Sequence, residues 1–231
     1  MRHLIIITLS IIIFSCNPKT SEEYNAEAEL LEQEGKFDQA IPLLDKAIEK
    51  DPNNLYALTN RAVDKTIIKD YNGAINDYSL IISIDSNNVL AYLNRGRNKI
   101  RIEQYYEATK DFDLALLKKI SFIDTFKSKS PKEAMKMTKE IMKMSEFSAT
   151  TEEILFSRGR ALFEIDSLNS ALNDFNNCIK MNYSLSDCYY WRAFVYINGG
   201  MRLKGCEDLH KSHELGDSFA MQEINKYCVS K

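Results

Sequence analysis

The chain has 231 residues and a formal net charge of −3, and 45% of its residues are apolar. Its 30 basic and 33 acidic side chains are nearly balanced, so the charge does not predict a nucleic-acid partner. Only 8 Gly and 4 Pro argue against a turn-rich all-β chain. Abundant Ala, Leu, Ile, Lys and Glu favours helices instead.

Residues 1–15 have the features of a secretory signal peptide. Arg2 precedes the apolar run 4–14, which is shorter than the ~20 residues that a membrane-spanning helix needs. The run ends in Ile13-Phe14-Ser15-Cys16, which resembles the lipobox of bacterial lipoproteins, although Phe14 is bulkier than the usual residue there. The resemblance implies that Cys16 carries lipid, and two or more acyl chains anchor a protein stably to a membrane.

The expected location follows from this anchor. Residues 16–21 would form a polar tether, and the mature chain would lie in the cell envelope, in the outer membrane facing the periplasm. Asn17, rather than Asp, after the lipid-bearing Cys16 is compatible with the outer membrane. The alternative is an ordinary cleaved signal in which Cys16 has no special role.

A 34-residue repeat follows the tether. Aromatic residues recur at this step, as do small and large apolar residues at fixed offsets from them. The recurring residues are Phe37, Tyr71 and Tyr105; Ala40, Ala74, Ala108, Ala171 and Gly205; and Leu44, Tyr78, Phe112, Phe175 and Leu209.

This pattern resembles the tetratricopeptide repeat family, in which each unit is a pair of antiparallel helices with small residues at positions 8, 20 and 27 and a large residue at 24. The resemblance implies an all-α, TPR-like α-solenoid of antiparallel helix pairs, whose units stack because one unit cannot bury its apolar face alone. The units begin at residues 21, 55, 89, 152 and 186. The expected organisation is a signal peptide (1–15), a tether (16–21), units one to three (22–122), a helical insertion (123–151), units four and five (152–219) and a capping helix (220–231).

A charged pair recurs within the units. Arginine at position 7 and aspartate at position 23 are 16 residues apart in four units, whereas unit one has Glu27 and Leu43 there. Joint presence and joint absence predict an ion pair that links the two helices. A ring of ligand-binding arginines is the alternative. The pairs are Arg61 with Asp77, Arg95 with Asp111, Arg158 with Asp174, and Arg192 with Asp208.

The insertion is rich in lysine and methionine. Residues 132–147 have a helical apolar stripe, flanked by Met135 and Met142. Thioethers suit Cu(I), but flexible methionine side chains more commonly fill a core gap or cover a partner surface.

Four cysteines lie in the last third of the chain. The cell envelope expected from the signal peptide is an oxidising compartment, which permits disulfides. Their positions on adjacent helices favour pairing of Cys206 with Cys228, and less strongly of Cys178 with Cys188. Free buried thiols are one alternative. A zinc site is another, because Cys206, His210 and His213 share a helical face that Cys228 could approach. The segment from Gly205 onward resembles the end of tetratricopeptide lipoproteins from Bacteroidetes-type bacteria.

In the resembling family, positions 2, 5, 9, 12 and 13 of each first helix line a concave groove. Here this groove would be acidic in unit one, with Asn25, Glu29 and Glu32, then basic, then aromatic. Arginine and aromatic residues are common at binding hot spots, so a partner segment with apolar anchors and a carboxylate is expected. The alternative is that the aromatics pack on the insertion or the cap. The expected contact residues are Arg97, Arg101, Phe156, Arg160, Tyr190, Trp191 and Phe194.

No catalytic or phosphate-binding motif was found in the sequence, so we expect neither enzyme activity nor a cofactor or metal. The leading hypothesis is a protein–protein interaction scaffold or adaptor, lipid-anchored in the envelope, that binds another protein or a peptide segment. The alternatives are a metal-dependent or accessory envelope enzyme and a self-associating structural lipoprotein. The identity of the partner and the oligomeric state remain open.

Overall fold

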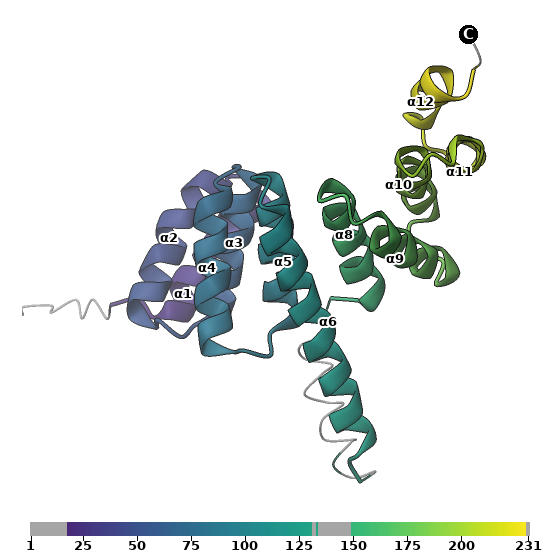
Figure 1. Ribbon diagram of the computed structural model, residues 1–231. Helices are drawn as coiled ribbons and strands as arrows, with labels where there is room; N and C mark the ends of the chain where they lie inside the picture. Colours follow the sequence, from purple (N-terminus) through teal and green to yellow (C-terminus); the bar gives the residue numbers. More distant parts are fainter. Residues whose placement is uncertain (1–17, 131–132, 134–148, 230–231) are drawn as a thin grey trace, which may run out of the picture.

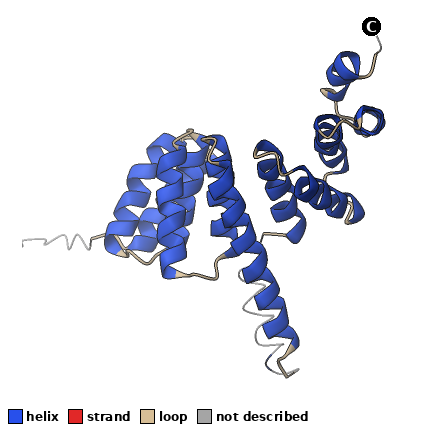
Figure 2. Cartoon of the chain, in the orientation of Figure 1, coloured by secondary structure: helices blue, strands red, loops and turns tan. Residues whose placement is uncertain are grey.

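The computed structural model describes residues 18–130, 133 and 149–229, and in this part of the chain it is built of helices and loops without strands (Figures 1 and 2). The signal peptide and Cys16 lie outside the described residues, as do most of the methionine-rich insertion and both ends of its expected helix. The helices are α1 (Ser21–Gln33), α2 (Phe37–Lys50), α3 (Leu55–Ile67), α4 (Tyr71–Ile84), α5 (Val89–Arg101), α6 (Tyr105–Lys127), α8 (Thr151–Glu164), α9 (Leu168–Lys180), α10 (Leu185–Asn198), α11 (Arg202–Glu214) and α12 (Ala220–Tyr227).

These helices form five pairs and a final short helix, which confirms the all-α solenoid. Each pair packs together, and each second helix also packs on the first helix of the next pair. The described part of the chain contains no helix that is both long and apolar enough to span a bilayer.

The turn inside each pair has the same backbone geometry. Unit position 15 has a positive φ in all five units, and the residue after it donates its N–H back to the carbonyl five positions earlier. This is the Schellman arrangement that ends many helices. This residue is glycine in units one and five, whereas Lys69, Glu103 and Asp166 adopt the positive φ in the other three.

The repeated small and large residues form the core. Every residue at positions 8, 20, 24 and 27 is buried. The small residues let the helices approach so closely that a Cβ added at Gly96 would lie 2.6 Å from Cε1 of Phe112. The side chain at position 24 therefore fills the space that the small residue at position 8 leaves.

The four expected ion pairs are present, and each arginine binds bidentately. Arg61, for example, donates from Nε and Nη2 to the two carboxylate oxygens of Asp77, at 2.9 and 2.6 Å. The other arginine nitrogen reaches back to position 25 of the preceding unit, which is Asp45 in this case, at 2.7 Å. Each arginine thus ties together three helices. The corresponding partners are Ser79 for Arg95, Asp113 for Arg158 and Asn176 for Arg192.

The insertion does not interrupt this stacking. α6 is 23 residues long and projects beyond the neighbouring helices (Figure 1), and the chain returns to start α8 at Thr151. α8 nevertheless packs on α6 as the first helix of the next unit. Arg158 donates to Asp113 at 2.7 Å, and the two residues are 45 positions apart in the chain. The corresponding residues of contiguous units, such as Arg61 and Asp45, are 16 positions apart. The hydrogen bonds that Arg158 donates to Asp174 and Asp113 raise its pKa above the ordinary value, so the clamp stays charged.

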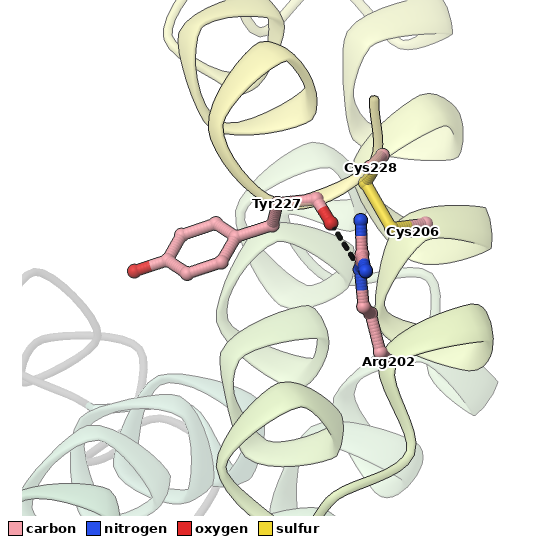
Figure 3. Close-up of a disulfide and its surroundings, with 4 residues drawn as sticks. All are labelled: Arg202, Cys206, Tyr227 and Cys228. Carbon is pink, nitrogen blue, oxygen red and sulfur yellow. Dashed lines mark hydrogen bonds between the residues drawn. A yellow bond between two sulfur atoms is a disulfide. The ribbon is translucent and has the colours of Figure 1, made fainter. Parts of the chain in front are cut away.

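A disulfide holds the last helix. Cys206 of α11 is bonded to Cys228 at the end of α12, and the Arg202 guanidinium donates to the Tyr227 carbonyl beside it (Figure 3). The pairing expected for Cys178 with Cys188 was wrong: both are buried free thiols. Each thiol instead points at a backbone carbonyl, that of Glu152 for Cys178 and that of Tyr183 for Cys188.

Candidate functional site

The first helices of the units, α1, α3, α5, α8 and α10, form one side of the solenoid. α1 approaches α3, α5 approaches α8, and α8 approaches α10. We call the surface lined by their positions 2, 5, 9, 12 and 13 the inner face. The contact residues expected from the sequence lie on it or, like Trp191 at position 6, directly beside it.

Three arginines gather on the inner face where unit three meets unit four. Arg97 and Arg101 lie one turn apart on α5, and Arg160 lies opposite on α8. Burial, followed by repulsion from Arg101 and Arg97, lowers the pKa of Arg160, and Glu164 and Asp187 oppose this only in part. The cluster therefore carries positive charge that its acidic neighbours compensate only in part.

The three arginines differ in how many partners they have. Arg97 donates from Nε to Ser157 at 3.2 Å and approaches Glu153 at 3.9 Å. Arg160 has no hydrogen bond or ion pair with the described residues, and its Nε is buried without an acceptor. A buried donor in this condition is unfavourable unless a ligand or solvent satisfies it.

Aromatic side chains adjoin Arg160. Its guanidinium carbon lies 4.8 Å from the ring centroid of Trp191, a cation–π contact. Trp191 in turn contacts Tyr190 and Phe194, with centroids 6.1 and 6.3 Å apart, and Phe163, at 5.9 Å. The cluster is half-buried, so it leaves aromatic surface beside the arginines.

Two of the expected aromatic contacts, Phe194 and Phe156, also have partners outside this cluster. Phe194 packs edge-on against Tyr227 of α12, with centroids 6.1 Å apart, so the cap covers part of the cluster. Phe156 packs on Phe175 and Tyr183, at 6.1 and 6.0 Å, and belongs largely to the core of unit four. Among the expected aromatic contacts, Trp191 and Tyr190 are therefore the more available for a partner.

The opposite end of the inner face is acidic. Asn25, Glu29 and Glu32 follow one another on α1, and Asn25 donates to Glu29 at 3.0 Å. Glu32 lies beside Asp64 of α3, which is 1% exposed. Burial and the charge of Glu32 raise the pKa of Asp64 to about 7.

Sequence reasoning missed Asp64 and the apolar surface of α3. Tyr56, Val63 and Ile67 occupy groove positions 2, 9 and 13 of unit two, and they are 44, 39 and 47% exposed. Applying the same positional rule to unit two would have found all three. Asp64 is at position 10, which the groove rule does not include.

The zinc arrangement weighed for the last helices is not formed. Cys206 and Cys228 are joined to each other, and His213 approaches the carbonyl of Asp217 through Nδ1, at 3.2 Å. Within the described residues, no group of three or more potential ligands is arranged to hold a metal ion.

Comparisons with known proteins agree with this architecture. Residues 21–54, the first of the five units, match the tetratricopeptide repeat family. The structure resembles that of MamA, with a TM-score of 0.66 and 16% identity over 91% of this chain and 97% of the other. It also resembles YrrB, described as a tetratricopeptide protein with an unusual peptide-binding site, with a TM-score of 0.66 and 18% identity over 89% and 92% of the chains.

A third similar structure is PilF of Pseudomonas aeruginosa, with a TM-score of 0.61 and 16% identity over 86% of this chain and 77% of the other. No curated protein matches the chain in sequence. At these identities the likeness establishes the fold alone. The chain is thus an α-solenoid of the tetratricopeptide type, and its first unit matches that family in sequence.

Proposed function

We propose that the chain is an interaction scaffold that binds a segment of another protein on its inner face, with a carboxylate of the partner at Arg101 and Arg160. The observation that carries the proposal is the buried Nε of Arg160, which has no acceptor among the described residues while two further guanidinium groups lie close by. A carboxylate can accept two parallel hydrogen bonds from an arginine and would offset the repulsion between the three charges.

The neighbouring aromatic surface defines the rest of the ligand. Trp191 and Tyr190 are half-buried and adjoin Arg160, so an apolar side chain next to the carboxylate would contact both groups. Large aromatics combined with arginine are the residue types that contribute most binding energy at interfaces. The proposed partner segment therefore carries an acidic group one or two residues from an aliphatic or aromatic anchor.

Selection from a random dodecapeptide library tests the proposal. The purified chain should enrich peptides in which an acidic residue or the C-terminal carboxylate lies near an apolar residue. Free and amidated C-termini distinguish the two carboxylate sources. Replacing Arg101 and Arg160 by glutamine should weaken binding of the enriched peptides at least tenfold.

The matched control removes the same charge elsewhere. Lys50→Gln with Lys180→Gln changes two exposed lysines on second helices and should leave binding unaltered. Equal binding by the wild type and the Arg101→Gln/Arg160→Gln variant would contradict the placement of the site.

We further propose that Cys16 carries a lipid that holds the solenoid at a membrane of the cell envelope. The support is the lipobox-like sequence before Cys16. Incorporation of radiolabelled palmitate by the wild type, and its absence in Cys16→Ala, is the expected result. Labelling of both or of neither would exclude lipidation at Cys16.

A further inference from the structure

The acidic end of the inner face has a property that the proposed carboxylate site does not explain. Glu29 and Glu32 on α1 and Asp64 on α3 bring three carboxyl groups together, and Glu32 and Asp64 are within hydrogen-bonding reach of each other. None of the three forms an ion pair with the described residues.

Several oxygens here are buried and have no donor. Asp64 Oδ2, Glu32 Oε1 and Asn25 Oδ1 have no hydrogen-bond partner in the described structure. Asp64 and Asn25 are 1 and 5% exposed, so both side chains are almost fully withdrawn from solvent. Oxygens of this kind accept hydrogen bonds, and a group of them without donors fits a ligand that supplies N–H groups.

No basic side chain is among the groups that shift the pKa of Asp64 or Glu32. Lys65, next to Asp64 on α3, is held by Asp77 of α4 at 2.8 Å. Lys36, which directly precedes α2, is paired with Glu34 at 2.6 Å.

On α5, the side chain that faces α3 near Asp64 is the neutral Asn98. Its side-chain oxygen accepts a hydrogen bond from Thr66 of α3 at 3.0 Å. The charges that act on Asp64 and Glu32 are therefore their own and that of Glu29.

We infer that Glu32 and Asp64, with Glu29 beside them, bind a positively charged side chain of the partner segment, a lysine or an arginine. The inference rests on the proposed function, because it assumes that a protein segment lies on the inner face. It adds a direction: the basic residue lies over α1 and α3, and the carboxylate lies over α5 and α8.

The surface of α3 beside Asp64 suits such a side chain. Val63 precedes Asp64, and Ile67 follows it by three residues, and both are exposed. Lysine and arginine have long aliphatic stems that pack on apolar surface while the charged end binds elsewhere. An ammonium or guanidinium group thus fits better than a metal ion, because the described residues provide no set of three ligands arranged for one.

Binding would be coupled to loss of a proton. With a pKa of about 7, raised by burial and by the charge of Glu32, Asp64 holds a proton in mildly acidic solution in the unliganded protein. An incoming cation stabilises both carboxylates, so this proton passes to the solvent. Affinity for a basic peptide should therefore rise at least fivefold between pH 5.5 and 8.

The test uses the purified chain and a library of N-acetylated dodecapeptides with free C-termini, so that lysine and arginine side chains are the only cations and both carboxylate sources are present. The wild type should enrich lysine or arginine in addition to the acidic–apolar feature. Glu32→Gln with Asp64→Asn should bind the enriched basic peptides at least tenfold more weakly at pH 7.5, without losing the acidic–apolar preference. Asp38→Asn with Glu49→Gln, two exposed acids of α2, is the matched control and should bind as the wild type does.

The other outcomes overturn the inference in distinguishable ways. If the wild type shows the acidic–apolar preference but not the basic one, or if Glu32→Gln/Asp64→Asn does not weaken binding, the cation site is wrong and the proposed function stands. If the wild type enriches no peptide, both fail. If millimolar calcium chloride stabilises the wild type against heat but not the variant, the site belongs to a metal ion instead.

Discussion

Replacement of Asp64 by asparagine should stabilise the protein at alkaline pH and leave it nearly unchanged in acid. Asp64 is 1% exposed, and its pKa rises from 3.8 to about 7 because of burial and the charge of Glu32. The folded state therefore retains a proton that the unfolded chain loses above pH 4. Stability falls as pH rises from about 4, and the loss is complete above about 8.

The magnitude follows from the size of this shift. Each pKa unit corresponds to about 1.4 kcal/mol, so a shift of about three units gives a ceiling of about 4 kcal/mol on the cost of ionising Asp64 in the folded protein. Asparagine has nearly the same shape and cannot ionise. Asp64→Asn should thus gain about 2–4 kcal/mol over the wild type at pH 8 and less than about 1 kcal/mol at pH 4.

Urea denaturation followed by circular dichroism at pH 4, 6 and 8 measures this difference directly. The comparison of variant and wild type at each pH cancels the titration of groups that do not interact with Asp64, but not that of Glu32. A difference that stays constant from pH 4 to 8 would refute the reasoning, because it would mean that Asp64 ionises in the folded protein as it does in the unfolded chain.

Three further predictions concern the scaffold and are measured by urea denaturation. Arg158→Leu should lower the free energy of unfolding by about 3–5 kcal/mol, because it leaves the buried Asp174 carboxylate unpaired. Adding Asp174→Leu should recover most of this loss, and no recovery in the double variant would mean that the broken pair is not its cause. Gly96→Ala should lose about 1–2 kcal/mol through the clash with Phe112, less its gain in helix propensity, and Phe112→Leu should relieve it; a stabilised Gly96→Ala would show that the ring moves freely. Cys206→Ser should lower the free energy of unfolding by about 3 kcal/mol, because it removes a cross-link that spans 22 residues. Dithiothreitol should cause the same loss in the wild type and no further loss in the variant.

The periodic features of the fold could be predicted because every unit repeats them. A step of 34 residues and an offset of 16 predicted the helix pairs, the core positions and the arginine–aspartate contacts. The second partner of each arginine was not predictable in this way, because position 25 holds Asp45, Ser79, Asp113 or Asn176 in different units. What these side chains share is an oxygen that accepts a hydrogen bond, and a search for one residue type does not detect that property.

The candidate site was predicted less completely than the fold. The positional rule correctly placed Arg97, Arg101 and Arg160 near one another, but it could not show that Arg97 has partners within the molecule. Asp64 was missed because position 10 lies outside the groove rule and the other units have Leu30, Asn98, Ala161 and Val195 there, so no acidic residue recurs at this position. For Cys178 and Cys188, positions on adjacent helices did not decide the pairing, since both are free thiols buried in the core.

The contact between Arg158 and Asp113 shows that two units can stack in the usual way when they are not adjacent in sequence. Units three and four meet through the same clamp as units that are contiguous in sequence, although many more residues separate them. The chain between α6 and α8 can thus change in length without loss of the contact between these two units. Evolution can therefore lengthen, shorten or replace the sequence between α6 and α8 without changing the inner face. For the same reason, a reporter domain can be inserted there.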